Sequence, residues 1–271
     1  MGSLVTKALH RLGKPAAFLF ILSLLSCGGG RSPWKLVWMD DFEGAALDTA
    51  SWTRVPRGPH DWNNTMSLRE DLARLEDGSL VLLGEVNADT LSDPSRLVSA
   101  GVTSAGKQAF RLARFEIRAR FSCARGFWPA LWLMPQRDST TTVRDYAEID
   151  IMEHLNADTV VHQTVHSGFS LNGHDETPPH STLASIDPDG WNVYAVEVHP
   201  DSLCFFVNDI HTLTYPRIVN DIEPEKNQFP FDSLPFYFIL SNQLGGRWVG
   251  PVEESDLPCE LRIDWVKVFT R

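Results

Sequence analysis

The sequence predicts an all-β fold, namely an antiparallel β-sandwich, and three observations support this class. Apolar and polar residues alternate with period two in many short segments, the pattern of strands with one buried and one solvated face. Turns rich in Gly, Pro, Asn and Asp separate these segments. No segment has a convincing long amphipathic helix, and a parallel sheet would need crossover helices. We therefore expect antiparallel pairing.

The segment 114–121 shows the alternation most clearly, because Phe115, Ile117 and Ala119 alternate with charged residues. Similar short runs predict further strands at 80–83, 131–134, 148–152, 160–166, 194–198, 203–207, 236–241 and 261–269. Two polar or Pro-containing stretches are expected to be surface loops, namely 138–144 and 218–231.

Composition limits the possible functions. The chain has 271 residues, of which 43% are hydrophobic and 22% charged, enough for one sizeable core. A net charge of −11 argues against binding to nucleic acid or to anionic lipid. Nine tryptophans are a large number, and partly exposed indoles offer flat faces to sugar rings or protein partners. We expect a monomer.

The N-terminus has the order of an export signal. Lys7, Arg11 and Lys14 precede the apolar run 16–25, which is about half of the roughly 20 residues that a membrane-spanning helix needs. The segment Leu24-Leu25-Ser26-Cys27 resembles a bacterial lipobox, in which the cysteine is lipidated. A plain secretory signal is the alternative, and with either signal the protein leaves the cytoplasm.

These features predict three parts of the chain. Residues 1–26 are expected to be a lipoprotein signal peptide, 27–33 a Gly/Ser tether and 34–271 a single domain. An acyl chain on Cys27 would anchor the exported protein to a membrane. The other cysteines have no metal-ligand spacing and are expected to be small buried hydrophobes, with one disulfide as an open alternative: Cys123, Cys204 and Cys259.

The segment 147–154 carries three acids inside an apolar strand. In a regular strand Glu148 and Asp150 share one face, whereas Glu153 points to the other. A β-bulge around Ile151 and Met152 would insert one residue and bring Glu153 beside the other two. Because like charges raise one another's pKa, one of the acids would then keep its proton near neutral pH.

Such a group of acids suits the hydrolysis of a glycosidic bond. Retention of configuration requires an ionised carboxylate as nucleophile and a protonated acid about 5 to 5.5 Å away. When the covalent intermediate forms, the negative charge of the nucleophile disappears, and the acid can then activate water. The alternative is that Glu148 and Asp150 belong to the solvated face of an ordinary strand.

The segment Glu148-Ile149-Asp150-Ile151-Met152-Glu153 resembles the bulged active-site signature of family 16 glycoside hydrolases of the laminarinase and β-glucanase type. Six further segments are similar to segments of that family, in the family's order: 38–42, 77–80, 113–118, 126–132, 244–250 and 263–268. The resemblance extends from about residue 34 to residue 271. It implies a jelly-roll, concanavalin-like sandwich with a substrate cleft across the concave sheet.

The resemblance also implies roles for the three acids: Glu148 as nucleophile, Asp150 as its assistant and Glu153 as general acid/base. It implies a retaining endo-β-glycosidase that acts on an extracellular β-glucan or β-galactan and needs no cofactor for catalysis. Transglycosylation uses the same intermediate and stays open. A glycan-binding lipoprotein that has lost turnover is the alternative from another functional class.

Other residues are candidates for the cleft. Trp132 is expected to be a sugar platform, and His166 is expected beside Glu153. A metal site at the histidines of 160–166 is disfavoured, because β-branched neighbours oppose a helix there. The remaining candidates for substrate binding are Trp128, Asn63, Gln243 and Trp248. Asp264 corresponds to a position that binds a structural calcium in some family members.

The sequence departs from the family pattern just before the signature. Common laminarinase-like members carry Trp-Pro and Gly there, whereas this chain has Asp145-Tyr146-Ala147. Gln243 replaces a small residue and could contact an axial hydroxyl or an N-acetyl group. These departures favour, as an alternative substrate, the β-galactosyl linkage of poly-N-acetyllactosamine in mucin-type O-glycans or keratan.

Overall fold

The computed structural model describes residues 34–271 except 59–62, 138, 140–145, 174–177 and 219–226, and Trp34–Arg271 forms one compact unit. The predicted signal peptide, the tether and Cys27 lie outside the described residues. Of the described residues, none belongs to a helix that is long and apolar enough to span a bilayer.

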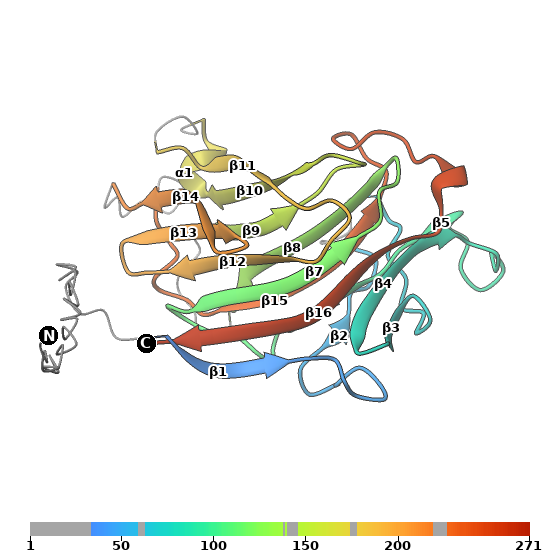
Figure 1. Cartoon of the computed structure of the whole chain (residues 1–271), viewed down its shortest axis with the longest axis horizontal. Coiled ribbons are helices and arrows are strands. Elements are labelled where there is room, and N and C mark those ends of the chain that lie inside the picture. Colours follow the sequence, from blue (N-terminus) through green and yellow to red (C-terminus); the bar gives the residue numbers. More distant parts are fainter. Residues whose placement is uncertain (1–33, 59–62, 138, 140–145, 174–177, 219–226) are drawn as a thin grey trace, which may run out of the picture. The chain divides into compact units, whose positions relative to one another are not determined.

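Two β-sheets face each other across the core. The first has the strand order β14-β13-β12-β7-β16-β4-β3, with β1 paired to β16 and β5 paired to β4. Figure 1 shows red β16 between green β7 and teal β4. Its strands are β1 (Lys35–Asp40), β3 (Ala73–Glu76), β4 (Ser79–Val86), β5 (Leu97–Val98), β7 (Arg114–Phe121), β12 (Asn192–Val198), β13 (Ser202–Val207), β14 (Ile210–Pro216) and β16 (Cys259–Thr270).

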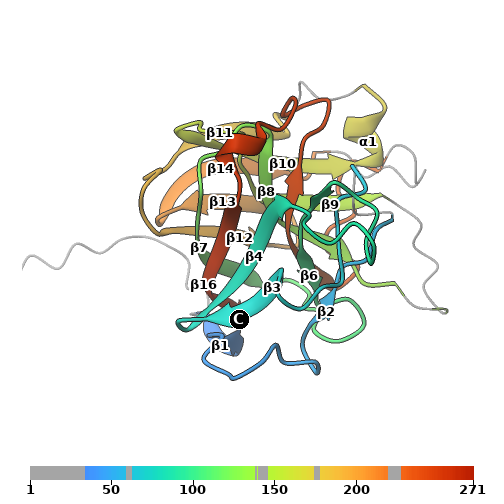
Figure 2. The ribbon, with the colours of Figure 1, turned by 90° about the vertical axis from the view of Figure 1, so that its right-hand side faces the viewer.

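The second sheet has the order β11-β10-β9-β8-β15-β6-β2 and carries the three acids. In Figure 2, β16, β4 and β3 lie on one side, and β9, β6 and β2 lie on the other. Strand pairing in both sheets is antiparallel, as predicted. The strands are β2 (Thr53–Arg54), β6 (Gly101–Thr103), β8 (Phe127–Pro135), β9 (Ala147–Glu153), β10 (Val160–Ser167), β11 (Ser181–Ser185) and β15 (Phe236–Leu244).

The core between the sheets follows the period-two pattern. Phe115, Ile117 and Ala119 of β7 are fully buried and face the core, as expected. In β10, Val161 and Val165 are buried, whereas His162 and Thr164 are half-buried on the opposite face. The described helical turns are short, namely α1 (Gly168–Leu171) and a 3₁₀ turn at Glu254–Asp256. The all-β prediction is therefore confirmed.

The cysteines within the described residues are free thiols. Cys259 is buried, as expected, but Cys204 is only partly buried and Cys123 is exposed. The expectation of three buried cysteines is thus wrong for Cys123, which follows the end of β7 and leaves the core, and for Cys204, which lies on the half-buried face of β13.

Candidate active site

A β-bulge in β9 brings the three acids to one face. On the neighbouring strand β8, Trp132 pairs with Asp150 and Leu131 pairs with Met152, so Ile151 is an extra residue without a partner. Ile151 is fully buried in the core. Glu153 therefore returns to the face of Asp150, where both line the same two cavities together with Glu148. The predicted bulge is confirmed.

A buried glutamine supports this bulge. Gln163 of β10 is fully buried, and its Nε2 donates a hydrogen bond to the carbonyl oxygen of Ile151 at 2.9 Å. Its Oε1 accepts a hydrogen bond from the hydroxyl of Thr212 in β14, which belongs to the other sheet. Gln163 thus connects the bulge to the opposite sheet. Sequence analysis did not identify it.

Burial and mutual repulsion raise the pKa values of two of the three acids. Asp150 is only 3% exposed, and burial together with the charge and hydrogen bond of Glu148 holds its pKa well above the usual range. Burial, followed by the charge of Asp150, raises the pKa of Glu153 as well. The indole Nε1 of Trp128 donates to Oε1 of Glu153 at 3.1 Å and opposes that rise. Asp150 and Glu153 therefore both hold a proton more readily than exposed carboxyls do.

His166 lies next to a different acid from the one expected. The register of β10 against β9 pairs His162 with Glu153 and pairs His166 with Glu148. Nε2 of His166 lies 3.2 Å from Oδ2 of Asp150. The expectation that His166 is the pairing partner of Glu153 is wrong, because antiparallel register places it further along the strand.

Tyr146 contacts Glu148 directly, and sequence analysis noted this residue only as a departure from the family pattern. Its hydroxyl donates a hydrogen bond to Oε2 of Glu148. Burial, the hydrogen bond and the negative charge of Glu148 raise the pKa of the phenol, so Tyr146 stays a donor. A signal was present in the sequence, because residues two apart in an extended segment share a face.

The larger cavity of the cleft has a volume of about 400 Å³ and has aromatic and histidine side chains in its wall. Trp248 is 47% exposed, and its ring meets those of Trp128 and His162 edge-on at 5.3 and 4.8 Å. Trp128 and Trp248, both predicted, therefore line the cleft. His180 of the same wall was not predicted.

Trp132 does not form the open platform that the sequence suggested. It is 6% exposed, packs in a small apolar cluster with Val55, Met66 and Ile239, and its Nε1 donates to Oγ of Ser241 at 3.3 Å. It lines the small inner cavity next to the acids, together with Gln243. Close packing from neighbouring strands leaves little of its ring accessible.

Asn63 and Asp264 lie apart from the acids. Asn63 is exposed, and its Nδ2 donates to the carbonyl oxygen of Leu244 at 2.7 Å, so it fastens a loop to the end of β15 and lines neither cavity of the cleft. The carboxylate of Asp264 pairs with Arg118 of β7. Within the described residues, Asp264 belongs to no group of three acidic, histidine or cysteine side chains, and calcium binding at this position stays a prediction.

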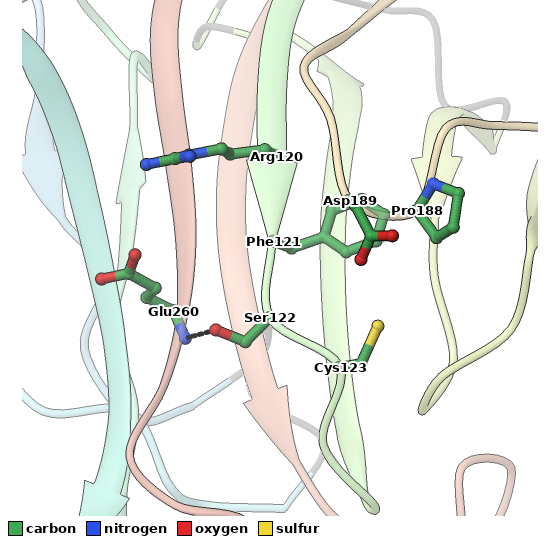
Figure 3. Close-up of a pocket in the computed structure, with 7 residues that line it drawn as sticks. All are labelled: Arg120, Phe121, Ser122, Cys123, Pro188, Asp189 and Glu260. Atoms are coloured by element: carbon green, nitrogen blue, oxygen red, sulfur yellow. Dashed lines mark hydrogen bonds between the residues drawn. The ribbon is translucent and has the colours of Figure 1, made fainter.

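Outside the cleft, a cavity of about 330 Å³ lies at the end of β7, lined by residues 120–123 and by Pro188, Asp189 and Glu260 (Figure 3). Ser122 Oγ accepts a hydrogen bond there from the backbone N–H of Glu260 at 3.1 Å. Burial, followed by the charge of Asp189, raises the pKa of the Cys123 thiol, which disfavours the nucleophilic thiolate. The cleft over β9 is therefore the better candidate for catalysis.

Comparisons with known proteins point to the same chemistry. The family model described as glycosyl hydrolases family 16 matches residues 65–267. A keratan-sulfate endo-1,4-beta-galactosidase from Sphingobacterium multivorum is 33% identical over 240 residues, covering 87% of this chain. The match covers 55% of that relative, so the chain spans about half of its length. A beta-glucanase from Rhodothermus marinus is 33% identical over 286 aligned residues, covering 96% of both chains.

A solved structure adds a third relative. It represents the endo-acting O-glycanases that prominent members of the human gut microbiota express to initiate mucin breakdown. It superposes with a TM-score of 0.71 at 28% identity, covering 86% of this chain and 98% of that one.

Proposed function

Because this chain belongs to family 16 of the glycosyl hydrolases and is an endo-acting β-glycosidase, we propose that it cleaves internal β-linkages of an extracellular glycan with retention of configuration. The bulge that gathers Glu148, Asp150 and Glu153 in one cleft carries the proposal. Hydrolases of this family need no cofactor for catalysis.

The chemistry assigns a role to each acid. Glu153, protonated because burial raises its pKa, donates its proton to the leaving oxygen while Glu148 attacks the anomeric carbon. The bond between sugar and Glu148 removes a negative charge from the cleft, which lowers the proton affinity of Glu153. Glu153 then accepts a proton from the attacking water, and Glu148 leaves as a carboxylate. Asp150, protonated and buried, orients Glu148.

Two glycan classes are candidate substrates. The relationship to a beta-glucanase along nearly the whole chain supports a β-1,3- or β-1,4-glucan. A β-galactosyl linkage in keratan or in poly-N-acetyllactosamine of mucin-type O-glycans is the second candidate. The amide of Gln243 beside the acids favours it, because an amide can both donate to and accept from a sugar hydroxyl or N-acetyl group. The relative that acts on keratan sulfate adds support.

A glycan panel tests the activity. New reducing ends from laminarin, lichenan, keratan sulfate or mucin O-glycans identify the substrate, and sugar-transfer products reveal transglycosylation. Glu148→Gln and Glu153→Gln should each reduce turnover by orders of magnitude. Azide should restore activity to Glu148→Ala and give a glycosyl azide of inverted configuration. Glycan binding without new reducing ends would support a non-catalytic glycan-binding protein and contradict the proposal.

We also propose that residues 1–26 are removed, that Cys27 carries a lipid, and that residues 34–271 act as a monomeric catalytic domain outside the cytoplasm. The basic, apolar and lipobox order of the N-terminus supports this. Radiolabelled palmitate should enter the wild-type protein but not Cys27→Ala in a bacterial host. Light scattering of the released domain measures its oligomeric state, and a dimer would contradict the expected monomer.

A further inference from the structure

A tyrosine just outside β9 is the hydrogen-bond donor to Glu148 that the family signature does not account for. Tyr146 stands two residues before Glu148, so both side chains lie on the cleft face of the extended chain. The phenol is 39% exposed, and its hydroxyl donates to Oε2 of Glu148. Asp150 approaches the same carboxylate from within the strand. Glu148 therefore has two neutral neighbours that can donate.

The surroundings of Glu148 make this donor distinctive. Asp150 and Glu153 face the cleft from β9, and His166 faces it from β10, with His180 beyond. Oδ2 of Asp150 lies 3.2 Å from Nε2 of His166, and the carboxyl group of Asp150 therefore has both Glu148 and His166 as neighbours. Tyr146 is the neighbour whose hydroxyl is directed at Glu148. Its raised pKa keeps the proton on the phenol at neutral pH.

A carboxylate nucleophile must attack the anomeric carbon and later leave it. In the second step water attacks that carbon, the bond from the carbon to the Glu148 oxygen breaks, and its electron pair returns to the carboxylate. The proton of the water passes to Glu153. A hydrogen bond to Glu148 grows stronger as negative charge returns, so a donor there stabilises the transition state of this step more than the intermediate.

We propose that Tyr146 is a positioning residue that holds Glu148 for attack and promotes its departure from the glycosyl-enzyme. The inference rests on the proposed role of Glu148 as nucleophile. This role also gives a function to the departure from the family pattern before the signature, because the phenol of Tyr146 supplies a hydrogen-bond donor to the nucleophile.

The test compares Tyr146→Phe with the wild-type protein. The probes are 2,4-dinitrophenyl β-laminaribioside and β-lactoside, whose good leaving group makes the first step fast. Loss of a hydrogen bond to a charged group should lower the steady-state kcat by about 10- to 100-fold. The intermediate should accumulate and give a larger pre-steady-state burst.

Tyr237→Phe is the matched control. Tyr237 of β15 is a half-buried tyrosine that packs against the cluster around Trp132 and lines neither cavity of the cleft. Its variant should keep the wild-type kcat and burst. The ratio of the steady-state slope to the burst amplitude is independent of the fraction of folded enzyme, so partial unfolding of Tyr146→Phe cannot imitate a fall in this ratio.

The outcomes separate the two proposals. An unchanged kcat and burst in Tyr146→Phe, with azide rescue of Glu148→Ala intact, would overturn the role of Tyr146 alone. Failure of azide rescue, or a rescued product of retained configuration, would instead overturn the assignment of Glu148 as nucleophile, on which the role of Tyr146 depends.

Discussion

Replacing Gln163 tests whether the bulge needs its contact with the opposite sheet. Gln163→Leu keeps a side chain of similar size but removes the donor to the carbonyl oxygen of Ile151. Both residues are fully buried, so that carbonyl loses its hydrogen bond away from water. An unsatisfied buried acceptor costs about 1–3 kcal/mol, and we expect the free energy of unfolding to fall by about 2 kcal/mol.

The same variant should lose activity beyond its loss of stability. Ile151 and Met152 both lie opposite Gln163, and the extra residue determines on which face Glu153 appears. A bulge that relaxes moves Glu153 relative to Glu148, and misplacement of about 1 Å can cost ~100-fold in rate. We therefore expect kcat to fall at temperatures where Gln163→Leu is folded, with KM changed less.

Urea unfolding followed by fluorescence measures the stability, and reducing-end formation measures kcat. Thr212→Val is the matched control, because it removes the hydroxyl that donates to Gln163 but leaves the bond from Gln163 to Ile151. It should lose less stability and keep nearly full kcat. Wild-type stability and kcat in Gln163→Leu would refute the idea that this side chain supports the bulge.

Three further variants test the roles of other cleft residues. Trp128→Phe removes the donor that lowers the pKa of Glu153, so the protonated acid should persist to higher pH; the basic limb of kcat/KM should move upward, and a fixed or lowered limb would contradict this. Asp150→Asn mimics the protonated carboxyl, and its kcat at pH 7 should exceed that of Asp150→Ala by about 10-fold or more, because the amide still donates a hydrogen bond to Glu148. Equal kcat values of the two variants would exclude a donor role for Asp150. Trp248→Ala removes a half-exposed ring from the cleft wall and should raise KM severalfold while kcat changes less, as progress curves on the best glycan would show; an unchanged KM would count against glycan contact there.

The sequence could predict the strands that bury alternate residues. The segment around Ile117 shows that pattern because one side of β7 meets the core and the other does not. Strands of two residues, such as β2 and β5, are too short to show any period. The bulge could be predicted because the chemistry of three acids requires it, although no local pattern marks Ile151 as the extra residue.

The partners of the acids were harder to predict, since they come from other strands. The indole of Trp128 reaches Glu153 from 25 residues away, and the register between the strands decides that contact. The burial of Trp132 likewise depends on Val55 and Met66, which are distant in sequence. Sequence spacing alone cannot reveal whether an aromatic ring is exposed for stacking on a sugar or is buried beneath the cleft.

The different roles of the three acids depend on these partners more than on the sequence signature of 148–153. Each acid has a different neighbour: Tyr146 for Glu148, His166 for Asp150 and Trp128 for Glu153. Without such differences, three nearby carboxyls would share their protons and none would have a fixed role. The three neighbours come from the residue before β9, from β10 and from β8, so the whole central part of the second sheet must be in register for one acid to stay ionised while another keeps its proton.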